Sequence, residues 1–361
     1  MSPLEKIRRR VCARWLRTVR WEFWPPYIFY VPVAFNYVRL AIRHGGLKLP
    51  FCTNPGTING LQAGESKAFS LGRLFQHAPE FVAQTWLIAG SSPDEKITSL
   101  LKTIKAHEVT CPFILKPDCG NRGSGVKVIK TFAAAEEYLS AIEAPVILQR
   151  YAPGPLEAGV FYYRLPDAKN GQLFAITKKV FPRVIGDGQS TLEELIWRDE
   201  RASITGKKFC RRFARDLNHV VSAGAEWPLV NAGNHAQGCI FYDGGPLATD
   251  ALAERIDQIA KGLEGFYFGR FDVRYPAEAD LKAGRNFTIL EVNGFASEAT
   301  SIYDPGNSVF SAYRTLFHQW DLVFTIGAQN RQRNAPSPSW SSLWQRARSY
   351  RRERATHPLA D

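Results

Sequence analysis

The chain of 361 residues has the 45% hydrophobic and 22% charged content of a folded protein with a large core. Its formal charge of +12 is concentrated at the ends: residues 1–50 carry ten Lys/Arg and two acids, and residues 331–361 carry seven and two. The rest is near neutral, which argues against a nucleic-acid-binding body. The six cysteines form no C-x-x-C pair, so we expect reduced thiols in the cytosol rather than disulfides or a zinc site.

The charge and aromatic content of residues 1–50 predict a basic, aromatic arm that associates with a membrane surface. A capping-box pattern at Ser2–Glu5 starts a helix whose arginines suit anionic lipid. Residues 23–38 contain seven aromatics and no charge, but three prolines and a length below ~20 residues argue against a spanning helix. An arm packed on the body and a true transmembrane anchor are the alternatives. The apolar face of the helix is formed by Leu4, Ile7, Val11 and Trp15.

A lysine follows a helix-start signal after the arm. Gly64–Phe75 has the pattern of a helix with Ser66 as its N-cap, which makes Lys67 a first-turn residue. An ordinary surface lysine would give the same pattern, so this signal depends on the motifs that follow.

A glycine-rich loop follows the predicted strand that ends at Lys116. Gly120, Gly123 and Gly125 can reach positive φ and have no Cβ, so backbone N–H groups can close over phosphate oxygens. Lys116 adds a point charge for the same phosphates. Because glycine hairpins near a lysine are common, this pattern alone does not decide the function.

Two later strand patterns bring oxygen ligands together. Asp272, Glu291 and Asn293 fall at positions of one parity on neighbouring predicted strands, and Arg270 shares the face of Asp272. Oxygen ligands of this kind suit Mg²⁺, with water and phosphate filling its remaining positions. A surface ion-pair network is the alternative.

Together these motifs resemble those of ATP-grasp ligases. The run Lys116–Val126 is similar to the Lys-Pro-x-x-Gly-Asn-x-Gly-x-Gly-Val loop of cyanophycin synthetases and ribosomal-protein glutamate ligases. Arg270–Asp272 and Glu291–Asn293 resemble the Arg-x-Asp and Glu-x-Asn pairs of D-alanine–D-alanine ligase. The similarity implies an α+β ATP-grasp fold, with two α+β lobes that grip ATP and an arm in place of a Rossmann-like domain.

The resemblance also implies roles for individual residues. Arg270 would be catalytic and stabilise a tetrahedral oxyanion. Mg²⁺, with Mn²⁺ as the alternative, would be held by Asp272, Glu291 and Asn293. Because neighbouring residues of a strand face opposite ways, only one of Lys178 and Lys179 can reach the nucleotide, and we expect Lys178. The residues implied to bind ATP are Lys67, Lys116, Gly120, Asn121, Gly123, Ser124, Gly125, Gln149, Tyr151, Glu157 and Lys178.

The expected organisation has five parts, which the motifs delimit. They are the arm at 1–50, a helical linker part of the ligase body at 51–110, a small lobe with the glycine loop and adenine hinge at 111–156, a large lobe with the metal site at 157–328, and a basic tail at 329–361.

The function implied is an ATP- and Mg²⁺-dependent ligase that joins a carboxylate to an amine through an acylphosphate. Its substrates would be small-molecule, peptide or lipid-linked, and it would act in the cytoplasm at the inner face of the plasma membrane, without nucleic acid. A kinase on the same fold and a catalytically inactive nucleotide-binding module are the alternatives, and a homodimer is left open.

Two departures from these relatives concern the substrate. Residues 1–60 lack the strand–helix alternation of a Rossmann-like domain, and after Asn293 the chain reads Gly-Phe-Ala-Ser-Glu-Ala-Thr where D-alanine and glutamate ligases have Ser-Pro-Gly. The substrates of those ligases are therefore not expected here. His235, in a glycine-rich loop, is expected to be solvated.

Overall fold

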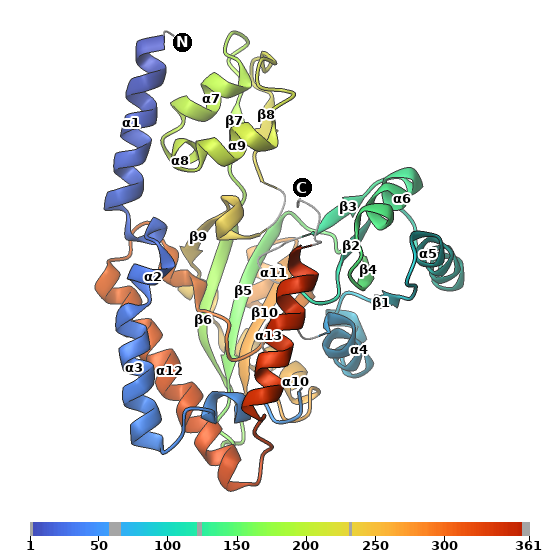
Figure 1. The fold of residues 1–361 in the computed structure, drawn as a ribbon, viewed down its shortest axis with the longest axis vertical. Helices are drawn as coiled ribbons and strands as arrows, with labels where there is room; N and C mark the ends of the chain where they lie inside the picture. The colour runs from blue at the N-terminus through green and yellow to red at the C-terminus, as the bar shows by residue number, and fades with distance from the viewer. Residues whose placement is uncertain (1–2, 58–65, 121–124, 231–232, 356–361) are drawn as a thin grey trace.

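Two antiparallel sheets in separate lobes form the body of the protein (Figure 1). The computed structural model describes all residues except 1–2, 58–65, 121–124, 231–232 and 356–361. Helices are interspersed with strands along the chain, and the strands within each sheet pair antiparallel, which confirms the predicted α+β class.

The small lobe is a four-stranded sheet in the order β1-β4-β2-β3. Alternation along β2 sends Phe113 and Leu115 into the core of this lobe and Lys116 to the opposite face. Lys96 is buried beside this core, and its Nζ donates to three backbone carbonyls just after α6. The elements of the lobe are β1 (Thr85–Ile88), α5 (Pro93–His107), β2 (Phe113–Pro117), β3 (Lys127–Ile129), α6 (Phe132–Ala141) and β4 (Val146–Arg150).

The large lobe is a five-stranded sheet in the order β11-β10-β5-β6-β9. On β5, Ala158, Val160 and Tyr162 are buried in a core shared with α4 and α10, whereas Glu157 and Gly159 face the other way. Ser66 caps α4 as predicted, since its side chain accepts from the Phe69 N–H. The elements of the lobe are α4 (Lys67–His77), β5 (Leu156–Tyr163), β6 (Gln172–Val180), β9 (Ile240–Asp243), α10 (Asp250–Lys261), β10 (Phe268–Tyr275), α11 (Glu278–Lys282) and β11 (Thr288–Asn293).

A small helical subdomain is inserted between β6 and β9. Its core includes Leu192, Ile196 and Phe209, and Thr191 with Glu194 forms a capping box at the start of α7. The subdomain carries α1 (Pro3–Val19) on its outer side (Figure 1). Its elements are β7 (Arg183–Ile185), α7 (Leu192–Arg198), α8 (Glu200–Ile204), α9 (Gly206–Arg212) and β8 (Glu226–Pro228).

The rest of the arm packs on the long helix α12 (Val309–Gln332). Phe29 and Val33 are buried against Leu316, and a Cβ at Gly327 would meet the Leu49 carbonyl oxygen at 2.1 Å, so helix and arm are in close contact. The described part of the arm thus has one face packed on the body, as one alternative predicted. None of the described helices combines the length and apolarity needed to cross a bilayer. The arm elements are η1 (Trp21–Phe23), α2 (Pro26–Phe29), α3 (Val31–His44) and η2 (Leu49–Cys52).

Short elements complete the chain between and after these units. They are η4 (Pro79–Phe81), η5 (His235–Gln237), η6 (Gly245–Leu247), η7 (Thr300–Tyr303) and α13 (Trp340–Ala355). The capping box expected at Ser2 lies outside the described residues.

Candidate active site

The predicted acidic face exists on the large sheet. Asp272 pairs with Glu291 across β10 and β11, and Arg270 pairs with Asn293, so the four residues form two adjacent rows on one face. Gly159 lies beside Asp272 on β5, where a Cβ would meet the Arg270 Cδ at 2.9 Å. The missing side chain leaves room for Arg270 and Asp272 to lie across the strand.

The Asp272 carboxylate is surrounded by cations. Its Oδ1 accepts from Arg270 Nε at 2.9 Å and lies 3.2 Å from Lys179 Nζ. Burial by itself raises the pKa of this carboxyl, but Arg270 and Lys179 outweigh burial and lower the pKa to about 2. Asp272 is therefore ionised at neutral pH and available to a divalent cation.

Two lysines, Lys116 on β2 of the small lobe and Lys67 at the start of α4, reach the same place. Lys116 Nζ donates to the Gln149 Oε1 at 3.0 Å and to the Leu290 carbonyl of β11 at 3.1 Å. Burial lowers the pKa of Lys116 to about 8, against the opposing effect of Glu291. Lys67 Nζ donates to the Gly120 carbonyl at 2.7 Å and lies 3.6 Å from Glu291 Oε1. The base of the glycine loop and the acidic face therefore meet directly.

These groups line one cavity of about 650 Å³, within the range of small-ligand sites. Cationic side chains from both lobes surround two carboxylates, an arrangement that matches a triphosphate with a divalent ion. The described residues contain no group of three His, Cys, Asp or Glu suited to a metal, and the predicted set consists of two acids and an amide. Its donors are all oxygens, and this fits Mg²⁺ with phosphate and water completing the shell.

Lys179, and not the predicted Lys178, lines the cavity. Lys178 points out of the cavity to Glu278, whereas Lys179 is buried and reaches Asp272. The cause is the register: Lys179 pairs with Glu157 across β5 and β6, so it shares the face of the site, and Lys178 takes the opposite face.

The other implied residues differ in their surroundings. Gln149 lines the cavity and its amide donates to the Leu290 carbonyl. Glu157 also lines it, with its carboxylate bound by Arg274. Tyr151 is 38% exposed and stacks under Arg274 outside the cavity lining. Gly120 lines the cavity, and Gly125 has a φ of 71°, as a glycine loop requires. The residues that lie outside the described part of the chain are Asn121, Gly123 and Ser124.

Residues of the arm complete the cavity wall, which the sequence did not indicate. The wall includes Trp21 and Tyr30 of the arm, which lie together with Glu298 and Tyr303 of the body. His235, expected to be solvated, is half-buried: its ring stacks on Tyr303 at 4.9 Å, and its Nε2 lies 3.3 Å from Glu22. No local pattern connects Tyr30 to Glu298, because 268 residues separate them.

The chain aligns with solved structures of a synthetase and of ligases, all at low sequence identity. The bifunctional glutathione synthetase from Pasteurella multocida aligns at 15% identity and a TM-score of 0.37 over 69% of this chain and 35% of that one. The VanG D-Ala:D-Ser ligase from Enterococcus faecalis aligns at 15% identity and a TM-score of 0.39, over 71% of this chain and 61% of that one. The ATP-grasp ligase PsnB, in a complex with Mg and ADP, aligns at 16% identity and a TM-score of 0.37, over 71% of this chain and 58% of that one.

The chain thus matches about a third to three fifths of the length of these three structures. No protein-family model and no curated protein sequence matches the chain.

Proposed function

We propose that the protein is an ATP- and Mg²⁺-dependent carboxylate–amine ligase that releases ADP and phosphate. The observation that supports this most is the meeting of Lys67 and Lys116, at the base of a glycine loop, with Asp272 and Glu291 across one cavity. Two carboxylates neutralised by cations from both lobes suit a nucleotide triphosphate and its metal.

The chemistry follows from charge. A substrate carboxylate oxygen attacks the γ-phosphorus of ATP, and the bond between this phosphorus and the oxygen that bridges it to the β-phosphate breaks. ADP leaves, and the substrate is now an acylphosphate. Lys116 and Lys67 hold the phosphates, and Lys179 takes the position that was predicted for Lys178. Asp272, Glu291 and Asn293 would hold Mg²⁺, which would neutralise phosphate charge when bound.

The second step forms the amide. An amine nitrogen attacks the acyl carbon, phosphate leaves, and the nitrogen loses a proton. The Arg270 guanidinium lies at the cavity wall, where it donates to Asp272 and to the Glu298 carbonyl, and it stabilises the oxyanion of the tetrahedral intermediate. Enclosure between the lobes protects the acylphosphate from water.

A trapping assay tests this proposal. The wild-type chain is incubated with MgATP, pooled amino acids and hydroxylamine, an uncharged nucleophile that converts an acylphosphate into a stable hydroxamate. We expect hydroxamate and phosphate in equal amounts, each dependent on ATP. A phosphorylated product that forms no hydroxamate would identify a kinase instead, and nucleotide binding without turnover would identify an inactive module.

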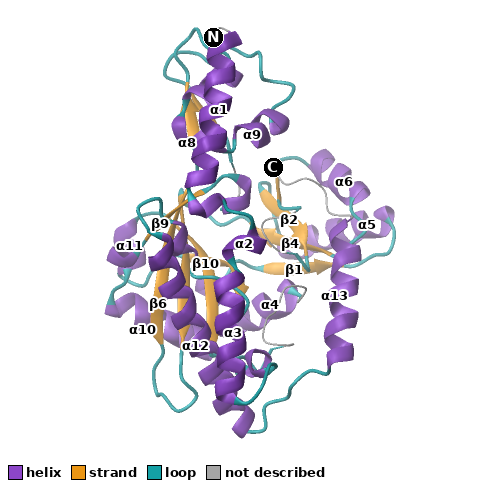
Figure 2. Cartoon of the chain, turned by 60° about the vertical axis from the view of Figure 1, so that its left-hand side comes forward, coloured by secondary structure: helices purple, strands orange, loops and turns teal. Residues whose placement is uncertain are grey.

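We also propose that the protein works at an anionic membrane surface on the cytoplasmic side. Nine apolar side chains on the outer faces of α1 and α3 are 47–80% exposed, and Figures 1 and 2 show the two helices one above the other along the same side of the molecule. Exposed Arg8, Arg14 and Arg17 accompany them. Apolar area flanked by arginine suits anionic lipid. The nine side chains are Leu4, Ile7, Val11, Trp15, Val19, Val31, Phe35, Val38 and Ile42.

Vesicle sedimentation tests the membrane proposal. We expect binding to vesicles that contain phosphatidylglycerol, weaker binding at high salt, and loss of binding in a Trp15→Ser, Phe35→Ser double variant. A Phe310→Ser variant, which changes an exposed aromatic on α12, serves as the matched control. Equal binding to neutral vesicles, or dimerisation through this face in place of lipid binding, would contradict the proposal.

A further inference from the structure

The cavity wall also holds a carboxylate that the phosphate chemistry does not use. Glu298 lies on the loop after β11, where the sequence departs from the Ser-Pro-Gly turn of its relatives. Its Oε1 accepts from the Tyr30 hydroxyl at 2.5 Å, and its Oε2 accepts from the Tyr303 hydroxyl at 3.0 Å. Each carboxylate oxygen is thus held by a hydroxyl donor, one from the arm and one from η7.

The negative charge of Glu298 has no ion-pair partner within the described residues, because the ion pairs there join other groups. Two neutral hydroxyls orient the carboxylate, and its charge acts on Arg270, whose pKa it helps to raise, without forming an ion pair with it among the described residues. Burial and Glu298 both raise the pKa of Tyr303, so this hydroxyl stays protonated and continues to donate. The cavity wall therefore presents a fixed anion to whatever enters.

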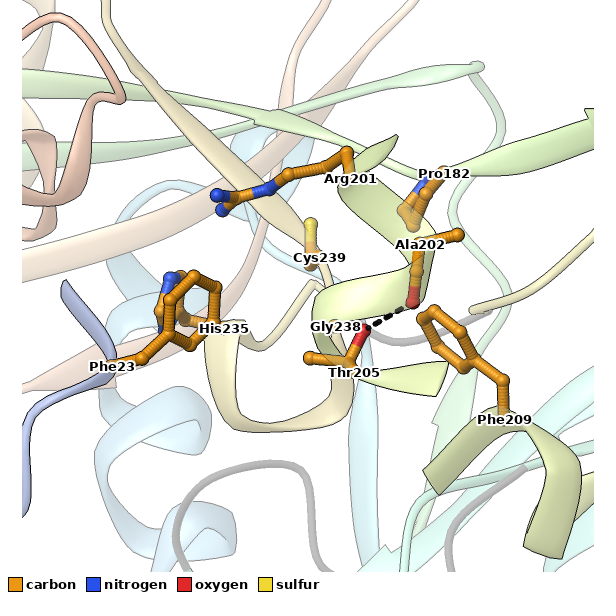
Figure 3. Close-up of a pocket in the computed structure, with 9 residues that line it drawn as sticks. All are labelled: Phe23, Pro182, Arg201, Ala202, Thr205, Phe209, His235, Gly238 and Cys239. Carbon is orange, nitrogen blue, oxygen red and sulfur yellow. Dashed lines mark hydrogen bonds between the residues drawn. The ribbon is translucent and has the colours of Figure 1, made fainter. Parts of the chain in front are cut away.

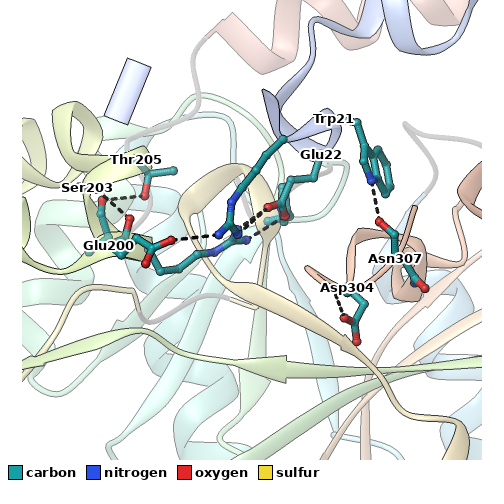
Figure 4. A network of polar contacts seen from close by, with 12 residues as sticks. Trp21, Glu22, Glu200, Ser203, Thr205, Asp304 and Asn307 are labelled. Carbon is teal, nitrogen blue, oxygen red and sulfur yellow. Dashed lines mark hydrogen bonds and ion pairs between the residues drawn. The ribbon is translucent and has the colours of Figure 1, made fainter. Parts of the chain in front are cut away.

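Another acid of the same region is already neutralised. Glu22 binds Arg201 and lies 3.3 Å from the His235 Nε2, and although burial raises its pKa, these partners lower the pKa to about 2 (Figure 4). Glu22 also lines the cavity of about 650 Å³, but its charge is already paired with Arg201. The separate gap that Phe23, Arg201 and His235 line in Figure 3 measures about 10 Å³ and has no room for a substrate. Glu22 therefore anchors the arm, and Glu298 is the acid that remains for a ligand.

Aromatic rings surround the position of Glu298. Trp21 stacks on Phe29 at 5.3 Å and on Tyr303 at 5.7 Å, and Tyr303 stacks in turn on His235. Trp21, Phe29, Tyr30 and Tyr303 all line the cavity. Such rings attract an ammonium group through their faces and accept an apolar substituent.

The position along the cavity also matters. Arg270 Nη1 donates to the Glu298 backbone carbonyl at 2.9 Å, so the oxyanion-stabilising arginine and the loop that bears Glu298 are in contact. A cation held by Glu298 would lie next to the place where the acyl carbon is attacked. That is where the second substrate of a carboxylate–amine ligase must bind.

We infer that Glu298, oriented by Tyr30 and Tyr303, binds the amine substrate as its ammonium form and takes the proton that the nitrogen must lose before it attacks. This substrate is a primary amine with an apolar substituent lying against Trp21 and Phe29. The inference rests on the proposed ligase function. It also gives the arm a role, since the arm supplies a wall of the acceptor site that a Rossmann-like domain would supply in other ligases.

Tryptophan fluorescence of the full chain with MgADP tests the inference, with 2-phenylethylamine as the ammonium probe and 2-phenylethanol as its neutral counterpart. We expect 2-phenylethylamine to quench the wild type and its Kd to rise about 10- to 100-fold in Glu298→Gln, as loss of a charged hydrogen bond predicts. Tyr30→Phe should raise that Kd by a smaller factor. Glu278→Gln, which changes an acid outside the cavity lining, is the matched control and should bind as the wild type does.

Two results would overturn the inference. One is an equal Kd of 2-phenylethylamine for the wild type and Glu298→Gln, and the other is wild-type binding of the neutral alcohol as tight as that of the amine. Hydroxamate formation by the wild type reports separately on the ligase function. A chain that traps no acylphosphate yet binds the ammonium through Glu298 would refute the proposed function alone.

Discussion

Replacement of Lys116 by methionine separates folding from nucleotide binding. The pKa of this buried lysine is lowered from 10.5 to about 8, which corresponds to roughly 3 kcal/mol of unfavourable burial of the charge. Methionine removes the unfavourable burial of the charge. It also leaves the Gln149 and Leu290 oxygens without their hydrogen-bond donor, which costs about 1–3 kcal/mol of stability for each oxygen. These opposing effects are similar in size, so we expect the free energy of unfolding of Lys116→Met to stay within about 2 kcal/mol of the wild type.

ATP affinity should change far more than stability does. A charge-assisted hydrogen bond of about 1.5–3 kcal/mol corresponds to a Kd for MgATP about 10- to 150-fold higher in Lys116→Met. Bound phosphate favours the protonated lysine, so ATP binding to the wild type takes up a proton above pH 8. The wild-type Kd should therefore rise with pH above about 8, and that rise should be absent in the variant.

Calorimetric titration from pH 7 to 9.5, with urea unfolding of the same samples, measures both effects. An unchanged Kd in Lys116→Met, or the same pH dependence in both proteins, would refute the assignment of Lys116 to the phosphates. The lowered pKa of Lys116 also makes the stability of the unliganded protein depend on pH. Because the folded-state pKa of Lys116 lies below the unfolded one, the burial penalty is present below pH 8 and is relieved as pH rises from 8 to 10.5.

Three further predictions concern the same two lobes. Lys179→Met should lower ATP turnover at least about 10-fold, whereas Lys178→Met should leave it within about 2-fold, as measured by phosphate release. Asp272→Ala and Glu291→Ala should each abolish Mg²⁺-dependent turnover in the same assay. Lys96→Met should destabilise the protein by about 2–4 kcal/mol in urea unfolding, because three carbonyls after α6 lose a buried donor.

Each of these predictions has a result that would count against it. An equal loss of ATP turnover in Lys179→Met and Lys178→Met would mean that the strand register does not decide which lysine contacts the nucleotide. Substantial turnover in both acid variants would remove them from the metal site. An unchanged urea midpoint in Lys96→Met would show that its hydrogen bonds contribute little, and Lys102→Met, a change on the same helix α5, serves as its control.

The sheet face of the site could be predicted because strand parity is a local property. Asp272 and Arg270 are two residues apart, as are Glu291 and Asn293, so each pair shares a face wherever the strands lie. Pairing of β10 with β11 then brings them together. Motif order alone predicted that Lys116 and the glycine loop would oppose this face.

Parity also explains why Lys179 lines the cavity where Lys178 was expected. Alternation correctly assigned Lys178 and Lys179 to opposite faces, but it cannot say which face is the inner one. That depends on the pairing of β6 with β5, which aligns Lys179 with Glu157. The burial of both partners shows the outcome, since Lys179 is 8% exposed and Glu157 is 7% exposed.

The amine end of the cavity lay beyond sequence reasoning because it is built by tertiary contacts alone. Tyr30 meets Glu298 across 268 residues, and Trp21 Nε1 donates to the Asn307 carbonyl across 286 (Figure 4). The aromatic content of residues 23–38 indicated only that the segment seeks an apolar or interfacial environment. In the structure Phe29 is buried against the body, whereas Phe35 is left 73% exposed.

Calorimetric titration of ATP into the wild type and Glu291→Gln, each with Mg²⁺ and with EDTA, tests most directly whether the two lobes share a metal-bound nucleotide. We predict that the wild type binds ATP far more tightly with Mg²⁺ than with EDTA, and that Glu291→Gln loses most of this difference while keeping its fold. No ATP binding by the wild type, or an undiminished effect of Mg²⁺ in the variant, would contradict a nucleotide site at this position.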